Sequence, residues 1–520
     1  MESNMENAEL MPTYGVYMVY VLGGFLASVV GVVLLLIAFW TQYTHRVHQK
    51  YRHIPGPKLG HFYSGHIKNF QDQLKSGEKI VGDLFRQWCM EHGPICILFF
   101  FTRPVLLACS PEAVKELIVA SKHPKDPMTY NDVAKLYGTD FMGYGLVTEM
   151  DHSIWAIRRG IVDPGFHRRY LKQSMTQFND SADLMIKRLH PKADGLTKVT
   201  MLNELNKVTL DVIAKVAFSC ELEIMGEGVS PFTEAVQATF SALQMKSKQP
   251  FIKWNPFKAA REHRKKVRQA CCLIRGLAVK TIKERLAAIE KEEDVPTDIL
   301  SYIINATGGL THQHYKMQNM VDDFVTFFIA GQETTANLLA CALLQLGLHP
   351  EILYRLKNEV ESVMGDKTTV DFEDLPKLQY MAAFLKESLR LFPPAGGTIR
   401  LTSEECYING YRIPAQTSCL VSFYALSRME KHFKDPLQFD PDRFTNNQDE
   451  HTLFSYLPFS LGPRICIGKN FAMIEAKVLL CKFLSNYELT LDPDQSLLME
   501  TQGTLRPKDG CRVTLKPTKA

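Results

Sequence analysis

Cys466 is the residue of this 520-residue chain with the clearest chemical potential, because it lies in a loop between two glycines directly before a helical run at residues 470–476. Backbone N–H groups and the positive end of a helix favour a thiolate, which is a soft anionic ligand for a metal. Arg464 is two residues away, and its planar donor fork suits a carboxylate. Phe459 can pack under the loop and shield the sulfur. The alternative is a buried free cysteine beside a turn.

A strongly apolar stretch at residues 324–348 predicts a buried helix that carries unusual residues in its middle. Small and polar side chains are unfavourable there for helix propensity or burial, and such exceptions tend to mark functional sites. Ala330, Gly331 and Thr334 share one face, where the small pair lets a flat cofactor approach a hydroxyl. Glu333 can supply protons to the Thr334 side through water. Alternatively, Thr334 bonds back to its own helix and bends it.

Two further sets of residues place charges at helical spacing. Trp155 and Arg159 are four residues apart, so they can present an indole N–H and a guanidinium to one anion, although such pairs are commonly surface packing. Glu387 and Arg390 are three residues apart, and Arg443 follows later in the chain. An isolated pair of this kind is usually a weak surface ion pair.

The composition limits the fold and function classes. With 46% hydrophobic and 22% charged residues, the chain has ordinary globular composition and enough apolar residues for a large core. The net charge of +4 is too small to favour nucleic acid as a partner, and twelve irregularly spaced cysteines favour reduced thiols. Helical periodicity at 171–218 and 231–290, with an apolar hairpin at 95–101 and 105–109, predicts one mainly helical α+β domain with small sheets over residues 59–520.

An uncharged apolar segment at residues 14–40 predicts a single transmembrane helix. At 1.5 Å per residue it would be roughly 40 Å long, which exceeds the ~30 Å hydrocarbon core of a bilayer. Three acidic residues precede it, whereas four basic residues follow in a basic, proline-rich linker at 41–58, so residues 1–13 are expected in the lumen and the domain in the cytosol. A cleaved signal peptide suits neither the length of the apolar run nor its acidic amino end.

The cysteine loop and the apolar helix together carry a family resemblance. The spacing Phe-x-x-Gly-x-Arg-x-Cys-x-Gly at residues 459–468 and the motif Gly-x-Glu-Thr at residues 331–334 resemble the cytochrome P-450 superfamily, the haem-thiolate monooxygenases. The resemblance implies the cytochrome P-450 fold, haem b as cofactor, and Cys466 as the axial ligand of the haem iron, which is the known ligation of that class.

The same resemblance assigns roles to the other residues. It implies that Glu333 and Thr334 deliver protons during dioxygen activation, and that Glu387, Arg390 and Arg443 form a structural lock behind the haem. The residues implied to contact the haem are Arg464, Trp155, Arg159 and Arg400 at its propionates, Phe459 at the sulfur, and Gly331 and Ala330 on the helix.

Several stretches are similar to the cholesterol 24-hydroxylase family, which implies a sterol substrate, cholesterol first, with its side chain pointing at the iron. Gly396 departs from that pattern, in which tryptophan stands at this position, and a glycine removes a large wall from the site; residues 395–399 are expected to face substrate. The similar stretches are residues 145–147, 295–300, 324–331, 371–375, 378–380, 385–391, 393–395 and 459–462.

The sequence leaves two other functions open. The substrate can be another lipophile, such as a fatty acid, retinoid, drug or other steroid, or the protein can be a non-catalytic membrane-anchored haem-binding sensor, against which the pair Glu333 and Thr334 argues. Without a flavin or nicotinamide motif, electrons must come from outside. The resemblance and the anchor imply the endoplasmic reticulum membrane, with O2 and NADPH-cytochrome P-450 reductase as partners.

Overall fold

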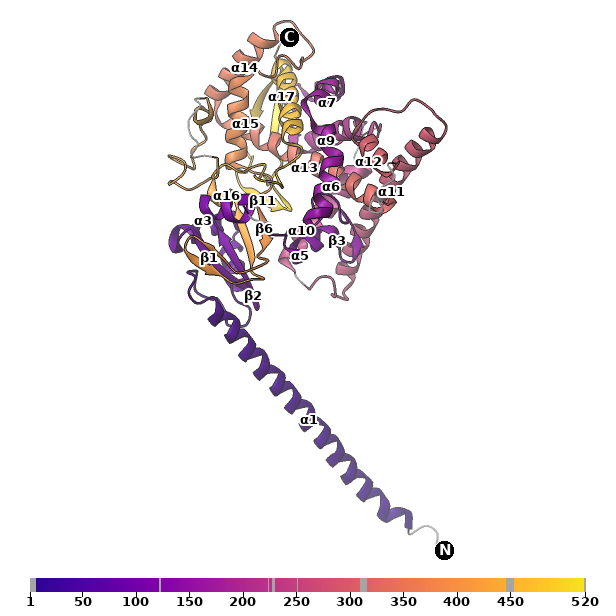
Figure 1. The fold of residues 1–520 in the computed structure, drawn as a ribbon, viewed down its shortest axis with the longest axis vertical. Coiled ribbons are helices and arrows are strands. Elements are labelled where there is room, and N and C mark those ends of the chain that lie inside the picture. Colours follow the sequence, from indigo (N-terminus) through magenta and orange to yellow (C-terminus); the bar gives the residue numbers. More distant parts are fainter. Residues whose placement is uncertain are drawn as a thin grey trace.

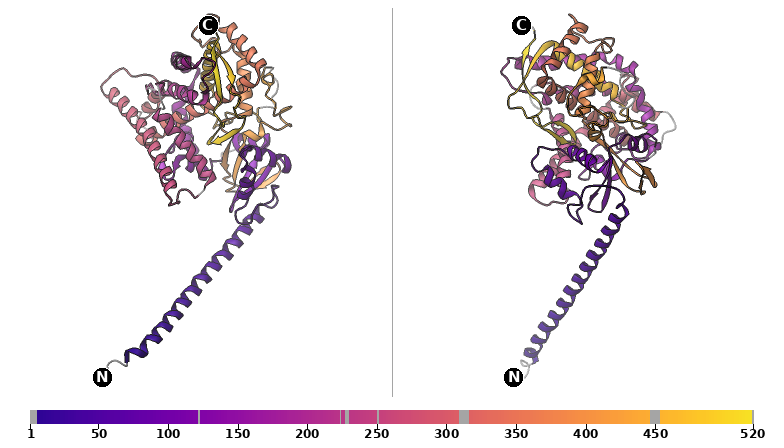
Figure 2. Two further views of the ribbon diagram at one scale, coloured as in Figure 1. Left: turned by 180° about the vertical axis from the view of Figure 1, so that it is seen from behind. Right: turned by 90° about the vertical axis from the view of Figure 1, so that its left-hand side faces the viewer.

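A computed structural model describes residues 6–120, 123–222, 224–226, 230–249, 251–308, 316–445 and 453–518. One long helix, α1 (Glu6–Lys50), extends away from a mainly helical domain, and strands β1, β2 and β6 lie at the end of the domain where α1 meets it (Figure 1). Two further views show the same separation of α1 from the domain (Figure 2). This architecture confirms the predicted α+β class.

The described elements alternate long helices with short strands. The remaining helices are α2 (Ile67–Leu74), α3 (Val81–His92), α4 (Pro111–Val114), α5 (Pro127–Ala134), α6 (His152–Val162), α7 (Arg168–Gln173), α8 (Met175–Leu189), α9 (Met201–Phe218), α10 (Pro231–Lys248), α11 (Lys258–Glu290), α12 (Ile299–Gly308), α13 (Met317–Leu348), α14 (Pro350–Met364), α15 (Gln379–Leu391), α16 (Phe423–Leu426) and α17 (Lys469–Asn486). The strands are β1 (Ile95–Phe100), β2 (Arg103–Ala108), β3 (Lys135–Leu136), β4 (Thr139–Asp140), β5 (Val199–Thr200), β6 (Gly397–Leu401), β7 (Cys406–Ile408), β8 (Tyr411–Ile413), β9 (Ser418–Ser422), β10 (Tyr487–Leu491), β11 (Met499–Gln502), β12 (Thr504–Pro507) and β13 (Arg512–Pro517).

The largest sheet has the strand order β1-β2-β9-β6. Strands β1 and β2 form the predicted antiparallel hairpin, in which Ile95 lies opposite Ala108 and the turn passes through Phe101 at φ 55°. Strand β9 pairs in parallel with β2 and antiparallel with β6, so that Arg400 lies opposite Cys419. The sheet therefore anchors β6, one wall of the site, to the hairpin nearest α1.

Helix α13 runs through the core of the domain. It packs against α9, α11, α15, α17 and strand β12, and most of its residues are buried. The apolar run at 324–348 is helical as predicted, but the helix begins earlier, at Met317, because the Asn319 side chain accepts a hydrogen bond from the Lys316 N–H (3.1 Å). Although α13 is long and apolar enough to cross a membrane, its burial marks it as a core helix.

Helix α1 is the other helix long and apolar enough to span a bilayer, and its most apolar window is not buried at all. The helix continues beyond the predicted end of the anchor at residue 40 as far as Lys50, because no proline or glycine interrupts the chain before Pro55. The segment after it is packed on the domain, where the Tyr51 hydroxyl lies 2.8 Å from that of Thr417. Helix α1 is thus joined to the domain through ordered contacts.

Candidate functional site

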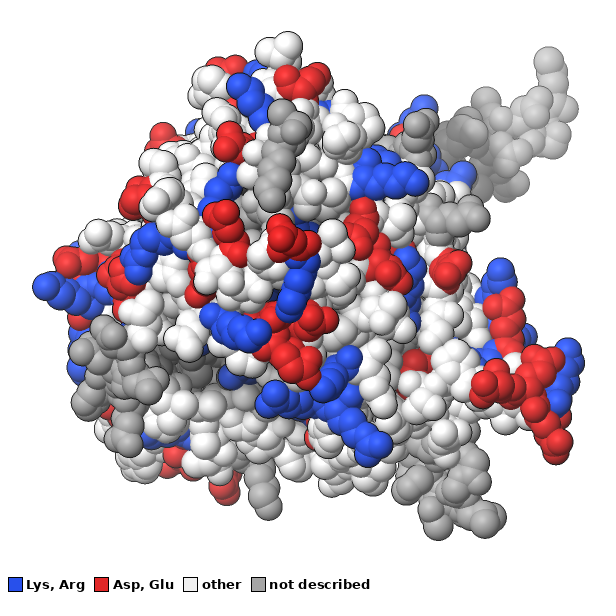
Figure 3. All heavy atoms as spheres, turned by 90° about the horizontal axis from the view of Figure 1, so that it is seen from above, with Lys and Arg blue, Asp and Glu red and all other residues white. Residues whose placement is uncertain are grey.

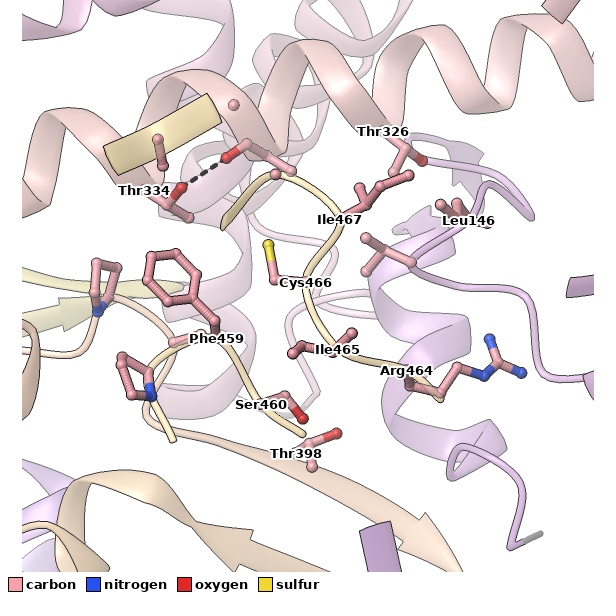
Figure 4. A pocket seen from close by; sticks show the side chains of 18 of the residues that line it. Leu146, Thr326, Thr334, Thr398, Phe459, Ser460, Arg464, Ile465, Cys466 and Ile467 are labelled. Atoms are coloured by element: carbon pink, nitrogen blue, oxygen red, sulfur yellow. Dashed lines mark hydrogen bonds between the residues drawn. The ribbon is translucent and has the colours of Figure 1, made fainter. Parts of the chain in front are cut away.

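A cavity of about 310 Å³ lies between α13, the loop at residues 458–468 and strand β6. The close view shows the Cys466 sulfur pointing into it, with Thr334 on the helix above and Phe459 beside it (Figure 4). The predicted site residues that line the cavity are Cys466, Arg464, Trp155, Arg159, Arg400, Phe459, Gly331, Ala330 and Thr334. The fold therefore brings together side chains from four separate parts of the chain.

The cysteine loop is held in a tight conformation that aims the sulfur into the cavity. The Cys466 N–H donates to the Phe459 carbonyl (2.9 Å), and both Ser460 and Gly462 have positive φ, 61° and 70°. Glycine at 462 is needed for two reasons. Its positive φ disfavours other residues, and a Cβ there would also lie 2.6 Å from the Ile118 carbonyl oxygen. The loop leads directly into α17, whose N-cap is Gly468.

The pKa of Cys466 differs from the expectation that backbone N–H groups and the helix end make a thiolate the favoured form. Burial has the largest effect and raises the pKa of the thiol, whereas the Gly468 N–H and the charges of Arg159 and Lys469 lower it. The pKa therefore lies above its ordinary value. A metal cation at the sulfur supplies the opposite charge that stabilises a thiolate, so metal binding and deprotonation would be coupled.

Three cations, two buried and one partly buried, line the cavity. Arg464 donates to the Glu149 carbonyl (2.9 Å), Arg400 donates to the Thr398 hydroxyl (2.9 Å), and Lys125 donates to the Val147 carbonyl. Among the described residues, none of these three cations forms an ion pair with a carboxylate. Burial lowers the pKa of Arg464 to about 10 and lowers the pKa of Lys125 and Arg400 as well. An anionic ligand would stabilise this cluster, because cations removed from water are unfavourable without an opposite charge nearby.

Lys125 is the site residue that sequence reasoning missed. It lies before α5, forms an isolated bridge to Arg400 and places its ammonium 4.5 Å from the centroid of the Tyr130 ring. A single lysine in a loop carries no spacing signal, and only the fold shows that it is fully enclosed beside two arginines. It adds a fifth polar side chain to the four predicted at the propionates.

Trp155 and Arg159 lie on α6, on the face turned to the cavity, as the four-residue spacing suggests. The Arg464 guanidinium stacks 4.1 Å above the Trp155 ring, and Arg159 donates to the Ile465 carbonyl (2.8 Å) while also pairing with Asp163 (3.0 Å). These contacts brace the cysteine loop against α6. Both residues therefore serve the loop as well as the cavity.

Thr334 lines the cavity, but Glu333 does not. The Thr334 hydroxyl donates to the Ala330 carbonyl (2.8 Å), which is the local bond considered as the alternative. The Glu333 carboxylate instead accepts hydrogen bonds from Thr504 (3.0 Å) and Asn337 (3.2 Å), on the side of β12. Burial raises the pKa of Glu333 despite these donors. A proton relay through both side chains requires Glu333 to turn.

Gly331 has a packing role beside its place at the cavity. A Cβ at this position would lie 2.8 Å from the Ile213 side chain on α9. Its small size thus permits close packing of α9 on α13 as well as room in the cavity. Ala330, on the same helix, also lines the cavity.

Glu387, Arg390 and Arg443 meet in a buried cluster outside the cavity. Arg390 binds Glu387 through two hydrogen bonds, of 2.6 and 2.8 Å, and Arg443 Nε lies 3.4 Å from the same carboxylate. Arg390 also donates to the carbonyls of Ser427 (2.9 Å) and Pro436 (2.7 Å). The cluster joins α15 to the segment that leads to the cysteine loop, and Glu387 and Arg390 are wholly inaccessible to solvent.

The wall predicted at residues 395–399 is only partly as expected. Ala395, Gly397 and Thr398 line the cavity, whereas Gly396 and Ile399 do not. Gly396 lies just before β6, where its carbonyl accepts a hydrogen bond from the Tyr424 N–H (3.1 Å), and a Cβ there would be 3.8 Å from the Tyr424 Cβ. The glycine at 396 therefore does not itself open the cavity.

The donor set fits the haem b that the resemblance implies. A single sulfur ligand faces the cavity, apolar and small residues flank it, and unneutralised cations at one rim suit two propionates. Among the described residues, no group of three or more His, Cys, Asp or Glu side chains could hold a metal ion.

Comparison with known proteins adds an independent observation. The sequence model of the family described as Cytochrome P450 matches residues 54–515. The chain is 27% identical to Cytochrome P450 4c3 of Drosophila melanogaster, over 94% of this chain and 93% of that protein. It is 28% identical to Cytochrome P450 4A10 of Mus musculus, over 95% and 97%, and 28% identical to Cytochrome P450 4V2 of Homo sapiens, over 82% of each. None of these names refers to cholesterol 24-hydroxylation.

Proposed function

The chain belongs to the cytochrome P450 family, and from this premise we propose that it is a membrane-anchored monooxygenase that hydroxylates an unactivated C–H bond of a lipid. The family carries haem b and uses O2 with electrons from a redox partner. The observation that carries the proposal is the cavity in which the Cys466 sulfur faces the Thr334 side of α13. A sterol, cholesterol first, is the substrate class that the similar sequence stretches support.

The residues of this chain would divide the work of holding the cofactor. Cys466 would supply the sulfur ligand, and Arg464, Arg400 and Lys125 would supply cations for the carboxylates of the haem. Bound haem would provide the redox chemistry that activates O2. Phe459 lies beside the sulfur in the cavity wall, and Arg159 braces the cysteine loop through the Ile465 carbonyl.

Two residues of α13, Thr334 and Glu333, would hold and transfer protons at the cavity. Thr334 has its hydroxyl at the cavity wall, where it can orient water or the reacting oxygen atoms while donating to the Ala330 carbonyl. Glu333 is the buried acid next to it, and burial raises its pKa above the ordinary value of a carboxyl group. Turning its side chain from Thr504 toward the cavity would deliver that proton.

The apolar wall supports a lipid as substrate. Near the sulfur the cavity is bounded by hydrophobic side chains, including Leu146, Ile213 and Phe327. Such a wall binds by burying apolar area and offers few polar groups to orient a hydrophilic compound. A fatty acid is the second candidate, because the same wall accommodates an acyl chain.

The membrane arrangement follows from the two ends of the fold. We assign residues 1–13 to the lumen, 14–40 to the bilayer of the endoplasmic reticulum, 41–58 to the linker and 59–520 to a cytosolic domain. The exposed rings of Phe251, Trp254 and Phe257, between α10 and α11, support contact of the domain with lipid, since Phe251 touches Phe101 of the hairpin nearest α1 (6.5 Å between centroids).

NADPH-cytochrome P450 reductase is the proposed electron donor. The face opposite α1 carries basic and acidic side chains interspersed, without a continuous patch of one sign (Figure 3). Docking there would use individual ion pairs, and Lys469 at the start of α17 is the basic residue nearest the cysteine loop in sequence. The mixed charge gives no footprint for nucleic acid.

The carbon monoxide difference spectrum of the reduced protein, recorded beside that of Cys466→Ser, tests the site. A thiolate-type band present in the wild type and lost in the variant supports the ligand assignment. Incubation with reductase, NADPH and a panel of sterols and fatty acids then tests the function. Substrate-dependent NADPH consumption with a hydroxysterol product is expected. A hydroxylated fatty acid would reassign the substrate, and a normal band without consumption would indicate a sensor.

A further inference from the structure

Two adjacent carboxylates on α13, Asp322 and Asp323, are unusual because both are buried near the amino end of a core helix. Neither lines the cavity. Instead, each accepts a backbone hydrogen bond from the loop at residues 141–149: Asp322 from the Tyr144 N–H (2.9 Å) and Asp323 from the Leu146 N–H (2.8 Å). The loop supplies Leu146 and Val147 to the cavity wall. The two acids therefore hold a cavity-forming loop by its backbone.

Each acid is paired with an arginine from a different helix. Arg158 of α6 lies 2.8 Å from Asp323 and also donates to the Tyr144 carbonyl. Arg275 of α11 lies 2.8 Å from Asp322 and donates to the Phe141 carbonyl (3.0 Å). Both arginines thus contact an acid and a loop carbonyl. Four side chains close a clamp around one short loop.

The loop sequence is adapted to this close contact. A Cβ at Gly143 would lie 2.1 Å from the Asp322 carboxylate, and one at Gly145 would lie 2.0 Å from the Thr326 hydroxyl. Only glycines therefore allow the loop backbone to reach the two acids. The Thr148 hydroxyl completes the turn by donating to the Gly143 carbonyl (2.6 Å).

The two ion pairs differ in how readily they can open. Arg158 and Asp323 are almost inaccessible, with side chains 2% and 1% exposed, so water cannot readily replace either partner, and Arg158 also lies 3.6 Å from Glu149 of the loop. The Arg275 side chain is 14% exposed, and burial raises the pKa of Asp322 in spite of Arg275. Water can replace Arg275 more easily than Arg158. The Arg275–Asp322 pair, which links the loop to α11, is therefore the weaker of the two attachments.

We infer that Arg275 and Asp322 are positioning residues that decide how firmly the 141–149 loop closes the cavity, and so how bulky ligands are retained. Arg158 and Asp323 form the permanent attachment of the loop, and the Arg275–Asp322 pair forms a releasable attachment that couples it to α11. The inference rests on the proposed function only in taking the cavity as the ligand site. A lipid would leave when the α11 end opens.

Arg275→Gln in the full-length, haem-loaded protein tests this inference by two readouts that do not depend on turnover. Hydrogen–deuterium exchange of peptides covering 141–149 should accelerate about tenfold at Tyr144, with a smaller change at Leu146. The dissociation rate of 4-phenylimidazole should rise about tenfold, while that of the smaller ligand imidazole changes less than about twofold. Arg268→Gln, an exposed position on the same helix, is the matched control.

Unchanged exchange at 141–149 in folded Arg275→Gln overturns the inference, as does an equal effect on both imidazoles or the same effect from Arg268→Gln. If Arg275→Gln loses haem, Arg275→Lys is the deciding variant. Lysine can pair with Asp322 or donate to the Phe141 carbonyl, but it cannot do both in the geometry of arginine. A hydrogen–deuterium exchange rate of Arg275→Lys at 141–149 that lies between the wild-type rate and the rate of an unprotected loop then supports the clamp. An exchange rate equal to that of the wild type refutes it. Absence of lipid turnover in the wild type with intact clamp readouts would refute only the proposed function.

Discussion

Oε1 of Glu333 accepts a hydrogen bond from the Thr504 hydroxyl at 3.0 Å, so the acid next to the cavity threonine is directed toward β12. Asn337, one turn along α13, donates to the same oxygen (3.2 Å) and to the Thr504 hydroxyl (2.9 Å). Three side chains thus hold the carboxylate in a closed buried network. Proton delivery to the cavity would begin with the breaking of this network.

Replacement of Glu333 by glutamine is expected to lower product formation by about 10²-fold, the usual contribution of a positioned acid or base. Haem content and the carbon monoxide band should stay unchanged, because Glu333 does not line the cavity. Single-turnover and steady-state product assays with reductase measure the effect. Thr504→Val, which removes the hydroxyl that links Glu333 and Asn337 but keeps the acid, should retain turnover. Wild-type rates in Glu333→Gln would exclude the relay.

Lys125→Met is expected to stabilise the haem-free protein but to weaken the retention of haem in the loaded protein. Lys125 is a buried cation without an acidic partner among the described residues, so an apolar replacement should raise the melting temperature of the haem-free protein. It should also speed haem loss about tenfold, since one charge opposite the propionates is gone. Transfer of haem to apomyoglobin measures the rate. Lys283→Met on the exposed side of α11 should do neither.

Glu387→Gln is expected to destabilise the domain by about 3–5 kcal/mol, because it leaves Arg390 buried without its bidentate partner. Urea unfolding followed by tryptophan fluorescence gives the free energy. The matched control is Glu284→Gln, which removes an exposed ion pair with Lys280 and should cost less than about 1 kcal/mol. An equal decrease in the free energy of unfolding in both variants would show that the buried cluster has no special structural role.

Gly462→Ala tests the geometry of the cysteine loop. Its φ of 70° and the 2.6 Å approach of a Cβ to the Ile118 carbonyl predict a displaced loop and reduced haem content. Gly138→Ala shares the positive φ, 89°, but has no atom within 4 Å of the new Cβ, so it should cost only about 1 kcal/mol of backbone strain. The haem-to-protein absorbance ratio of both variants measures the difference. Full haem content in Gly462→Ala would contradict the close contact.

Glu475→Gln is expected to flatten the pH dependence of stability. Burial on α17 raises the pKa of Glu475 well above its ordinary 4.5, so between 4.5 and that raised value the native state holds a proton that the unfolded state releases. Stability then falls as pH rises through this window, by up to about 1.4 kcal/mol per pH unit. Because glutamine stays neutral like the protonated acid, the unfolding free energies of the two proteins should diverge as pH rises from 5 to 7.5, with only the wild type falling. Parallel curves would show that the native state does not raise the pKa of Glu475.

Short-range patterns in the sequence determined much of the site. The loop carrying Cys466, Arg464 and Phe459 could be predicted because ten residues around a turn cannot separate far, and glycine positions dictate where a left-handed backbone is possible. The apolar anchor and the hairpin at 95–109 were predictable for the same local reason. Their periodicity and length restrict each segment to one kind of structure.

Only the tertiary structure decided which distant residues meet. Helical spacing places Glu333 beside Thr334 but does not say that Thr504, far along the chain, draws its carboxylate away. No pattern marks Lys125 as part of the cation cluster, and none shows that Gly396 lies beside Tyr424 and not at the cavity. Spacing sets the face of an element, whereas packing between elements selects the rotamer and the partner, because burial and hydrogen-bond satisfaction depend on every neighbour at once.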